Sequence, residues 1–386
     1  MRILIVAGEV SGDWIGALLA RRLKRFDPTC CLVGLGGCRM AAAGVRLAFD
    51  STRVGAIGLV EAVFSVPRAV GAFLKTRSLI ERDRPDVAVL IACEHLNVPL
   101  AWWLKRKRIP TISYFPPQIW MWKKVLRLAP LFFDVVLAAF PEEFDLYKKT
   151  NCKVVFTGHY LKDIMRPTTD EDRSLGRAEF GLTAKKPILA LLPGSRYHEV
   201  KVLVPVLLGA ASRLRQQIPT IHFLLPVAQR DFRDLITAEV HQRDLRESVT
   251  LCEDSHQAMK TADVGLVASG TASLEAALLG LPHIVLYRVS PITWTAVRLL
   301  QSSRLVTCSS VGLPNLLAGQ HVVPELLQEQ ANTANLVEET LALLNDEKRR
   351  SEMKRHFVNL ANQLGNGCNL DRAVQVILSY RNLAES

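Results

Sequence analysis

LLPGSRYHEV, residues 191–200, is the stretch from which the fold can be worked out. An apolar run over 188–192 predicts a buried strand, which stops at a Pro-Gly-Ser-Arg turn and gives way to a helical pattern. Such a junction leaves several backbone N–H groups pointing at one spot, which suits an anion. Ser195 lies in the turn, and Arg196 adds a guanidinium that matches phosphate oxygens. We hypothesise that this turn holds the diphosphate of a nucleotide sugar.

The composition is that of a globular chain too long for one ordinary core. With 386 residues, 49% hydrophobic and 22% charged, two domains are expected. The net charge of +11 favours anionic partners such as nucleotides, phosphorylated lipids or an anionic membrane face. The eight cysteines form no CxxC pair and no zinc-like cluster, so we expect no structural metal and a reducing, cytoplasmic setting.

Strand, turn and helix patterns alternate along the chain, which is typical of α/β proteins with doubly wound parallel sheets. We expect a polar connection over 161–186 and mostly amphipathic helix from 325 to about 380. Two tandem Rossmann-like domains, 1–165 and 166–360, would face each other across a cleft, with a helical tail at 361–386 packing back across them. The expected strands are 2–7, 31–35, 87–92, 111–115, 135–139 and 153–156 in the first domain, and 188–192, 221–226, 249–251, 264–268 and 283–287 in the second.

The turn GEVSGD, residues 8–13, follows the first expected strand. Its glycines, Gly12 among them, let the backbone approach a ligand closely. The carboxylates of Glu9 and Asp13 would repel a diphosphate, whereas they and Ser11 can hydrogen-bond sugar hydroxyls. The alternative is a tight turn in which Asp13 caps the following helix.

A second turn of this kind is ASGTASLE, residues 268–275. It begins with Ser269, and the N–H groups of Gly270 and Thr271 can bind phosphate at the start of a helix. Glu275 lies one turn further on and can accept both hydroxyls of a ribose. The alternative is a capping residue followed by a solvent-facing glutamate, but the spacing is too long for a capping box.

Two further candidates are single polar residues at the ends of predicted elements. Asn315 follows a proline-fixed turn, where it is either a plain N-cap or an amide that binds phosphate or uracil. Glu94 and His95 follow a central strand of the first domain, and either could act as a general base there, although a lone histidine is more often structural.

Aromatic and basic residues are mixed in two segments, WWLKRKR at 102–108 and YFPPQIWMWKK at 114–124. This mixture suits a membrane interface or, alternatively, single-stranded nucleic acid. For Trp102 and Trp103 we favour core positions with a solvated basic rim. No stretch approaches the ~20 apolar residues of a spanning helix, and the N-terminus turns polar too soon for a signal peptide, so membrane contact would be peripheral.

Together these stretches resemble the lipid-A-disaccharide synthase family, which comprises inverting glycosyltransferases with the two-domain GT-B fold. LLPGSR, ASGTASLE and LPNLLAG form a specific ordered set. The matching segments run nearly the length of the chain, at 8–13, 34–40, 58–61, Trp120 with Trp122, 158–159, 191–196, 199–200, 268–275, 287–288 and 313–319.

The resemblance implies a reaction that joins UDP-2,3-diacylglucosamine to 2,3-diacylglucosamine 1-phosphate, giving the β-1,6-linked lipid A disaccharide 1-phosphate and UDP. It implies no metal or other cofactor. The partners would be the two glycolipids and the cytoplasmic face of the inner membrane, with no nucleic acid and with a homodimer left open.

By position, the resemblance assigns Arg196 and Asn315 to UDP, residues 269–271 to the phosphates and Glu275 to the ribose. The turn at 8–13 and Asn97 would lie on the sugar or acceptor side, and the aromatic-basic segments would meet acyl chains and the membrane.

The first domain departs from the family pattern where the family has its favoured catalytic base. Ala92 stands in the place of that Asp, and His95 stands where a second Asp is often found, while Asn97 is kept. Either Glu94 or His95 replaces the base, which we rank first, or Glu9 or Asp13 acts instead. The third account is a divergent paralogue with another acceptor, or a UDP-sugar or lipid-binding protein with reduced catalysis.

Overall fold

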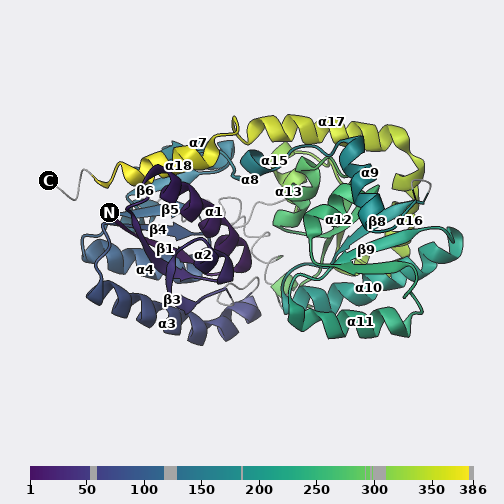
Figure 1. The fold of residues 1–386 in the computed structure, drawn as a ribbon, viewed down its shortest axis with the longest axis horizontal. Helices are drawn as coiled ribbons and strands as arrows, with labels where there is room; N and C mark the ends of the chain where they lie inside the picture. Colours follow the sequence, from purple (N-terminus) through teal and green to yellow (C-terminus); the bar gives the residue numbers. More distant parts are fainter. Residues whose placement is uncertain are drawn as a thin grey trace. The chain divides into compact units, whose positions relative to one another are not determined.

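The computed structural model describes residues 1–52, 59–116, 128–183, 186–291, 293–295, 298 and 310–381 (Figure 1). The chain divides into two compact units. Unit 1 comprises the described parts of residues 1–163, 290–307 and 363–386, and unit 2 those of 164–289 and 308–362. Each unit is built on one parallel sheet with helices packed against it, which confirms the predicted α/β fold class with two doubly wound sheets.

The sheet of unit 1 has the strand order β3-β2-β1-β4-β5-β6-β7. From β1 the chain runs outward through β2 and β3 and then returns to the other side of β1 with β4, so the topological switch point lies between β1 and β4. At this point Val6 pairs with Leu90 and Ala7 with Ile91. The strands are β1 (Arg2–Ala7), β2 (Cys31–Gly36), β3 (Arg46–Asp50), β4 (Val87–Ile91), β5 (Thr111–Tyr114), β6 (Val135–Ala138) and β7 (Lys153–Phe156).

Helices complete unit 1 because the central strands are apolar on both faces and need cover on each. One core cluster joins β1, β2 and β4 to α3, α4, α6 and α7. The helices are α1 (Val10–Phe26), α2 (Cys38–Ala42), α3 (Leu59–Arg82), α4 (Glu94–Arg106), α6 (Ala129–Phe132), α7 (Pro141–Lys148), α8 (Leu161–Ile164, which ends at the boundary with unit 2) and α18 (Asn369–Leu378).

The sheet of unit 2 has the order β10-β9-β8-β11-β12-β13. Its switch point lies between β8 and β11, where Leu192 pairs with Val267. Alternate side chains of β11 enter different clusters, because successive residues of a strand point to opposite faces. The strands are β8 (Ile188–Leu192), β9 (His222–Pro226), β10 (Val249–Cys252), β11 (Val264–Ala268), β12 (His283–Tyr287) and β13 (Glu325–Leu327).

Long helices pack on both faces of the second sheet. The larger cluster includes residues of α10, α11, α16 and α17, and the smaller one includes residues of α12 and α13. The elements are α9 (Asp170–Glu179), α10 (Tyr197–Gln217), the 3₁₀ turn η2 (Arg230–Phe232), α11 (Arg233–Gln242), α12 (Ser255–Thr261), α13 (Thr271–Leu278), α15 (Leu313–Ala318), the 3₁₀ turn η3 (Gln328–Gln330), α16 (Thr333–Asn345) and α17 (Glu347–Gln363).

Two edge strands were missed by the sequence patterns. β3 is partly exposed along its length, so it lacks the apolar run that marks a buried strand. β13 has only three residues and opens the stretch that we expected to be helical. β3 pairs in parallel with β2, and β13 pairs in parallel with β12. The local sequence does not reveal these partners.

The C-terminal helix α18 packs on α1 within unit 1, and the two ribbons lie side by side in Figure 1. Asp163 accepts hydrogen bonds from the N–H groups of Asn369 and Leu370 at the start of α18. The buried amide of Asn369 donates to the carbonyl oxygens of His159 and Leu364. These contacts tie the last helix to the loop after β7.

Two histidines are buried without charge. Burial lowers the pKa of His159 to about 3, and the ring stacks on Tyr160 with centroids 4.8 Å apart. Burial likewise lowers the pKa of His283 to about 4, in unit 2, where the ring stacks on Phe357. Both rings therefore stay neutral in the folded chain at mildly acidic pH values, where they are protonated in the unfolded chain.

These pKa values predict an acid-sensitive fold. Below the ordinary histidine pKa of 6.5, these rings bind protons in the unfolded state but not in the folded state. Each ring therefore lowers the free energy of unfolding by about 1.4 kcal/mol for each unit by which the pH falls. Between pH 6.5 and 5 the melting temperature should fall, and it should fall less steeply in His159→Gln and His283→Gln than in wild type. The exposed His241→Gln is the control, and an unchanged slope in both buried variants would contradict the account.

Candidate functional site

The two turns predicted to bind phosphate are neighbours in unit 2. The turn that starts α10 follows β8, and the turn that starts α13 follows β11, so they flank the switch point at the carboxyl ends of adjacent strands. Ligands of doubly wound sheets bind at such points. Both predicted turns therefore lie at this edge of the sheet, although they differ in their hydrogen bonding.

The N–H groups at the start of α10 donate hydrogen bonds to a carboxylate of the protein itself. Glu199 Oε2 accepts hydrogen bonds from the backbone N–H groups of Ser195 at 3.1 Å and Arg196 at 3.2 Å. The close approach depends on Gly194, whose φ is 103° and whose absent Cβ would lie 2.3 Å from the same oxygen. The expectation that these two N–H groups are available to a ligand anion is thus corrected. The spacing of Glu199, at the third position of the helix, is the signal for this cap.

The side chain of Arg196 is the part of this turn that can still contribute a charge to the site. Its Nη1 lies 3.1 Å from Glu199 Oε1, and about a third of the side chain is exposed. Gln229 donates to the Ser195 carbonyl oxygen at 2.9 Å and holds the turn from the loop after β9. The guanidinium is therefore held at the switch point.

The start of α13 is arranged differently. Gly270 adopts φ 136°, and among the described residues beyond its chain neighbours nothing lies within 4 Å of the position of a Cβ there. The hydroxyl of Ser269 donates to the Val311 carbonyl oxygen at 3.0 Å and does not cap the helix. Within the described residues, no acceptor is found for the backbone N–H groups of Gly270, Thr271 and Ala272. This helix start can bind an anion through N–H groups and the helix dipole.

Glu275 lies on the second turn of α13 and is buried, so the alternative of a solvent-facing glutamate is wrong. Its Oε2 lies 3.2 Å from Nε2 of His256, the second residue of α12. Sequence reasoning missed His256, because nothing in the local pattern connects it to a residue on another helix.

The side chain of Asn315 forms hydrogen bonds within unit 2. Its Oδ1 accepts from the N–H groups of Val322 and Val323, and its Nδ2 donates to the Val323 carbonyl oxygen and to Glu325 Oε1. The side chain is almost completely buried. The expected contact with phosphate or uracil is therefore replaced by a structural role, in which Asn315 links α15 to β13.

The turn at residues 8–13 is shorter than expected, since α1 already begins at Val10 and includes Ser11 and Gly12. Asp13 is buried on this helix, where its carboxylate accepts from the N–H groups of Gly37, Arg39 and Met40. It therefore caps α2 instead of its own helix. This arrangement corrects the account in which Asp13 meets a substrate hydroxyl, and Glu9 stays half-buried at the N-cap of α1.

The other turn at the switch point of unit 1 is strained. Ala92 and Cys93 adopt left-handed backbone conformations with φ of 46° and 53°, which are costly for residues other than glycine. Asn97 donates to the carbonyl oxygens of Ile91 and Ala92 and holds this backbone. The turn touches the one after β1, because a Cβ on Gly8 would lie 2.2 Å from Cys93 Sγ.

The two candidate bases, Glu94 and His95, are the first residues of α4, and both are half-buried. His95 is half-buried, and its Nε2 lies 3.7 Å from Cys93 Sγ. Tyr147 is buried in the core of unit 1, where burial and then the charges of Glu143 and other groups, among them Glu94, raise the pKa of its phenol.

The aromatic-basic segments are described in part. Trp103 packs against Phe73 and the core of unit 1, as expected. Trp102 is 46% exposed, so its expected core position is wrong, and the Arg106 guanidinium lies 3.7 Å from the centre of its ring. Trp120 and Trp122 lie outside the described residues.

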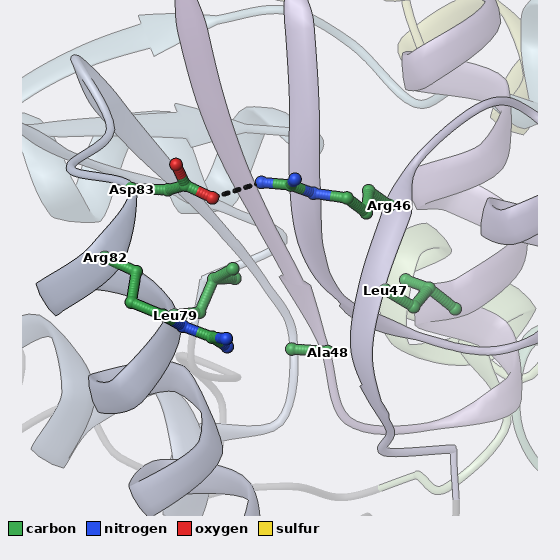
Figure 2. A pocket seen from close by; sticks show the side chains of 6 residues that line it. All are labelled: Arg46, Leu47, Ala48, Leu79, Arg82 and Asp83. Atoms are coloured by element: carbon green, nitrogen blue, oxygen red, sulfur yellow. Dashed lines mark hydrogen bonds and ion pairs between the residues drawn. The ribbon is translucent and has the colours of Figure 1, made fainter.

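A surface pocket of about 250 Å³ lies elsewhere on unit 1 (Figure 2). It is lined by the beginning of β3 and the end of α3, and the figure shows Arg46 paired with Asp83 across it. The pocket thus lies at the amino end of β3, away from the carboxyl ends that hold ligands in such sheets. In the described part of the chain, no group of acidic, histidine and cysteine side chains could hold a metal, and no helix is long and apolar enough to cross a membrane.

The two doubly wound parallel sheets form the GT-B fold of glycosyltransferases. In fold, the chain is similar to S. aureus MnaA in a co-structure with UDP (TM-score 0.67, 15% identity, covering 99% of this chain and 97% of that one). It is also similar to Acinetobacter baumannii MurG (TM-score 0.56, 15% identity, covering 98% and 99%).

Sequence comparison identifies the family. The model of the lipid-A-disaccharide synthetase family matches residues 3–376. A lipid-A-disaccharide synthase of Geobacter sulfurreducens is 34% identical over 384 residues, which cover 98% of this chain and 96% of the relative. The chain belongs to the lipid-A-disaccharide synthase family and is a hexosyltransferase.

Proposed function

We propose that the chain condenses UDP-2,3-diacylglucosamine with 2,3-diacylglucosamine 1-phosphate and releases UDP. The observation that carries this proposal is the start of α13, where three consecutive N–H groups have no acceptor among the described residues. Glu275 lies on the same helix, and Arg196 lies in the turn after the adjacent strand β8. This set matches the three parts of the donor's nucleotide that carry polar groups near one another: two phosphates and a ribose.

In this proposal the diphosphate of the donor lies against Gly270 and Thr271, and Glu275 accepts the ribose hydroxyls. Negative charge grows on the diphosphate as the bond to the anomeric carbon breaks. The helix dipole of α13 and the guanidinium of Arg196 stabilise that charge most strongly in the transition state. Ser269 shapes the turn through its bond to Val311.

The acceptor hydroxyl is a weak nucleophile and needs a general base. We assign this role to His95, because histidine is the side chain that most often acts as a general base and this one is half-buried at the switch point. The bonds of Asn97 to the strained backbone fix the turn from which His95 projects. Ala92, in the family's acid position, has no group that could take a proton.

Replacing Arg196 should affect turnover much more than folding. Arg196→Ala is expected to lower the rate of UDP release by about a hundredfold or more, since the growing charge loses its cationic partner. Arg213→Ala, on the exposed side of the same helix, is the matched control. Near-normal turnover of Arg196→Ala would remove this residue from the mechanism.

The base assignment can be tested by UDP release in the presence of both lipid substrates. His95→Ala should lose about 10²–10⁴-fold in rate while keeping its affinity for UDP, and Glu94→Gln should stay within a few fold of wild type. If both variants match wild type, neither residue is the base. If wild type binds UDP yet releases none, the second candidate holds, a UDP-sugar-binding protein, which Ala92 favours.

A membrane-facing surface on unit 1 also forms part of the proposal. Helices α3, α4 and α6 pack side by side and expose Val70, Leu74, Trp102 and Leu131. Trp102 under the Arg106 guanidinium combines an apolar ring with a cation, which suits the headgroup region of an anionic leaflet. This surface supports peripheral binding at the cytoplasmic face of the inner membrane.

Vesicles of phosphatidylglycerol and phosphatidylethanolamine provide the test of this surface. The double variant Leu74→Ala/Trp102→Ala should reduce the affinity of the chain for the vesicles by about tenfold, because two exposed apolar side chains no longer insert. Sedimentation measures the bound fraction, and Val358→Ala, an exposed apolar residue of unit 2, is the control. Equal binding of the double variant and wild type would refute this surface.

A further inference from the structure

We infer that His256 is a positioning residue that sets the ribose specificity of the site by holding one oxygen of Glu275. The inference rests on the proposed function, in which Glu275 accepts the ribose hydroxyls. It concerns a residue outside the motifs that carry the family resemblance, on a helix that follows an outer strand of the sheet.

The backbone of His256 is fixed by its own helix cap. Asp254 Oδ1 accepts from the N–H groups of His256 at 2.8 Å and Gln257 at 3.1 Å, so the first turn of α12 is held in place. The side chain of His256 then reaches α13, where Nε2 lies 3.2 Å from Glu275 Oε2. The imidazole is 29% exposed and the glutamate side chain 11%, so the histidine lies on the outer side of the carboxylate.

The two oxygens of Glu275 therefore have different tasks. Oε2 receives the imidazole N–H, which also compensates for the partial burial of the carboxylate. Among the residues that the structure describes, Oε1 has no recorded partner and can accept from a ligand. A carboxylate that accepts two adjacent hydroxyls must have its plane fixed, and the bond from His256 fixes it without contributing to phosphate binding.

This division of tasks separates ribose recognition from the rest of nucleotide binding. His256→Ala frees the carboxylate to rotate, so the cost should appear only with ligands that carry ribose hydroxyls. His256→Gln retains an amide N–H close to the position of Nε2 and should restore much of the binding. If His256 had only a structural role, His256→Ala would weaken the binding of all nucleotides to the same extent.

The experiment compares UDP with 2′,3′-dideoxy-UDP by isothermal titration calorimetry on the full chain. His256→Ala should weaken UDP binding by about tenfold and change dideoxy-UDP binding by less than twofold, with His256→Gln close to wild type. Adding His256→Ala to Glu275→Gln should cost nothing further, because the histidine acts through the glutamate. The exposed His241→Ala is the control for loss of a histidine.

Each other result has one meaning. Equal weakening of both nucleotides by His256→Ala, or no weakening of either, would overturn the positioning role. If Glu275→Gln leaves the preference for UDP over dideoxy-UDP intact, the ribose assignment of the proposed function fails instead. Melting temperatures of all variants show whether a loss reflects misfolding.

Discussion

Unsatisfied N–H groups at helix starts are the constraint on which this structure depends. Each helix begins with N–H groups that lack a partner in the helix, and burying them without an acceptor is costly. The chain meets this cost with its own carboxylates: Asp13 at α2, Glu143 at α7, Glu199 at α10, Asp254 at α12, Glu325 ahead of α15 and Asp163 at α18. At α13, beside the switch point of unit 2, no described residue forms such a cap.

This constraint separates structural carboxylates from functional ones. Asp13 and Glu199 lie on the first turns of helices that follow sequence patterns typical of ligand-binding turns, yet their oxygens accept hydrogen bonds from N–H groups of the protein. Glu275 has another kind of partner, a histidine side chain, and keeps one oxygen without a recorded partner among the described residues. In the proposed site, Arg196 supplies charge from its side chain, while the N–H donors belong to a different helix, α13.

Much of the fold could be predicted from the sequence, because the buried parallel strands are continuous apolar runs that end in turn residues. The exposed edge strand β3 and the three-residue β13 lack this signal. The sequence also placed the candidate turns at the switch points where the structure has them, since chain order and turn chemistry identify these points. The individual contacts could not be predicted, because the partners of Asp13, Asn315 and Glu275 lie on other elements. Only the Glu199 cap had a local signal, its position in the first turn.

The central claim is that the N–H groups at the start of α13 bind the diphosphate, while those at the start of α10 remain hydrogen-bonded to Glu199. A crystal structure of the chain with UDP tests this claim most directly. The account predicts phosphate oxygens within hydrogen-bond distance of the backbone N–H groups of Gly270 and Thr271, with Glu199 still bonded to Ser195 and Arg196. A diphosphate seated on the N–H groups of Ser195 and Arg196, with Glu199 displaced, would contradict it.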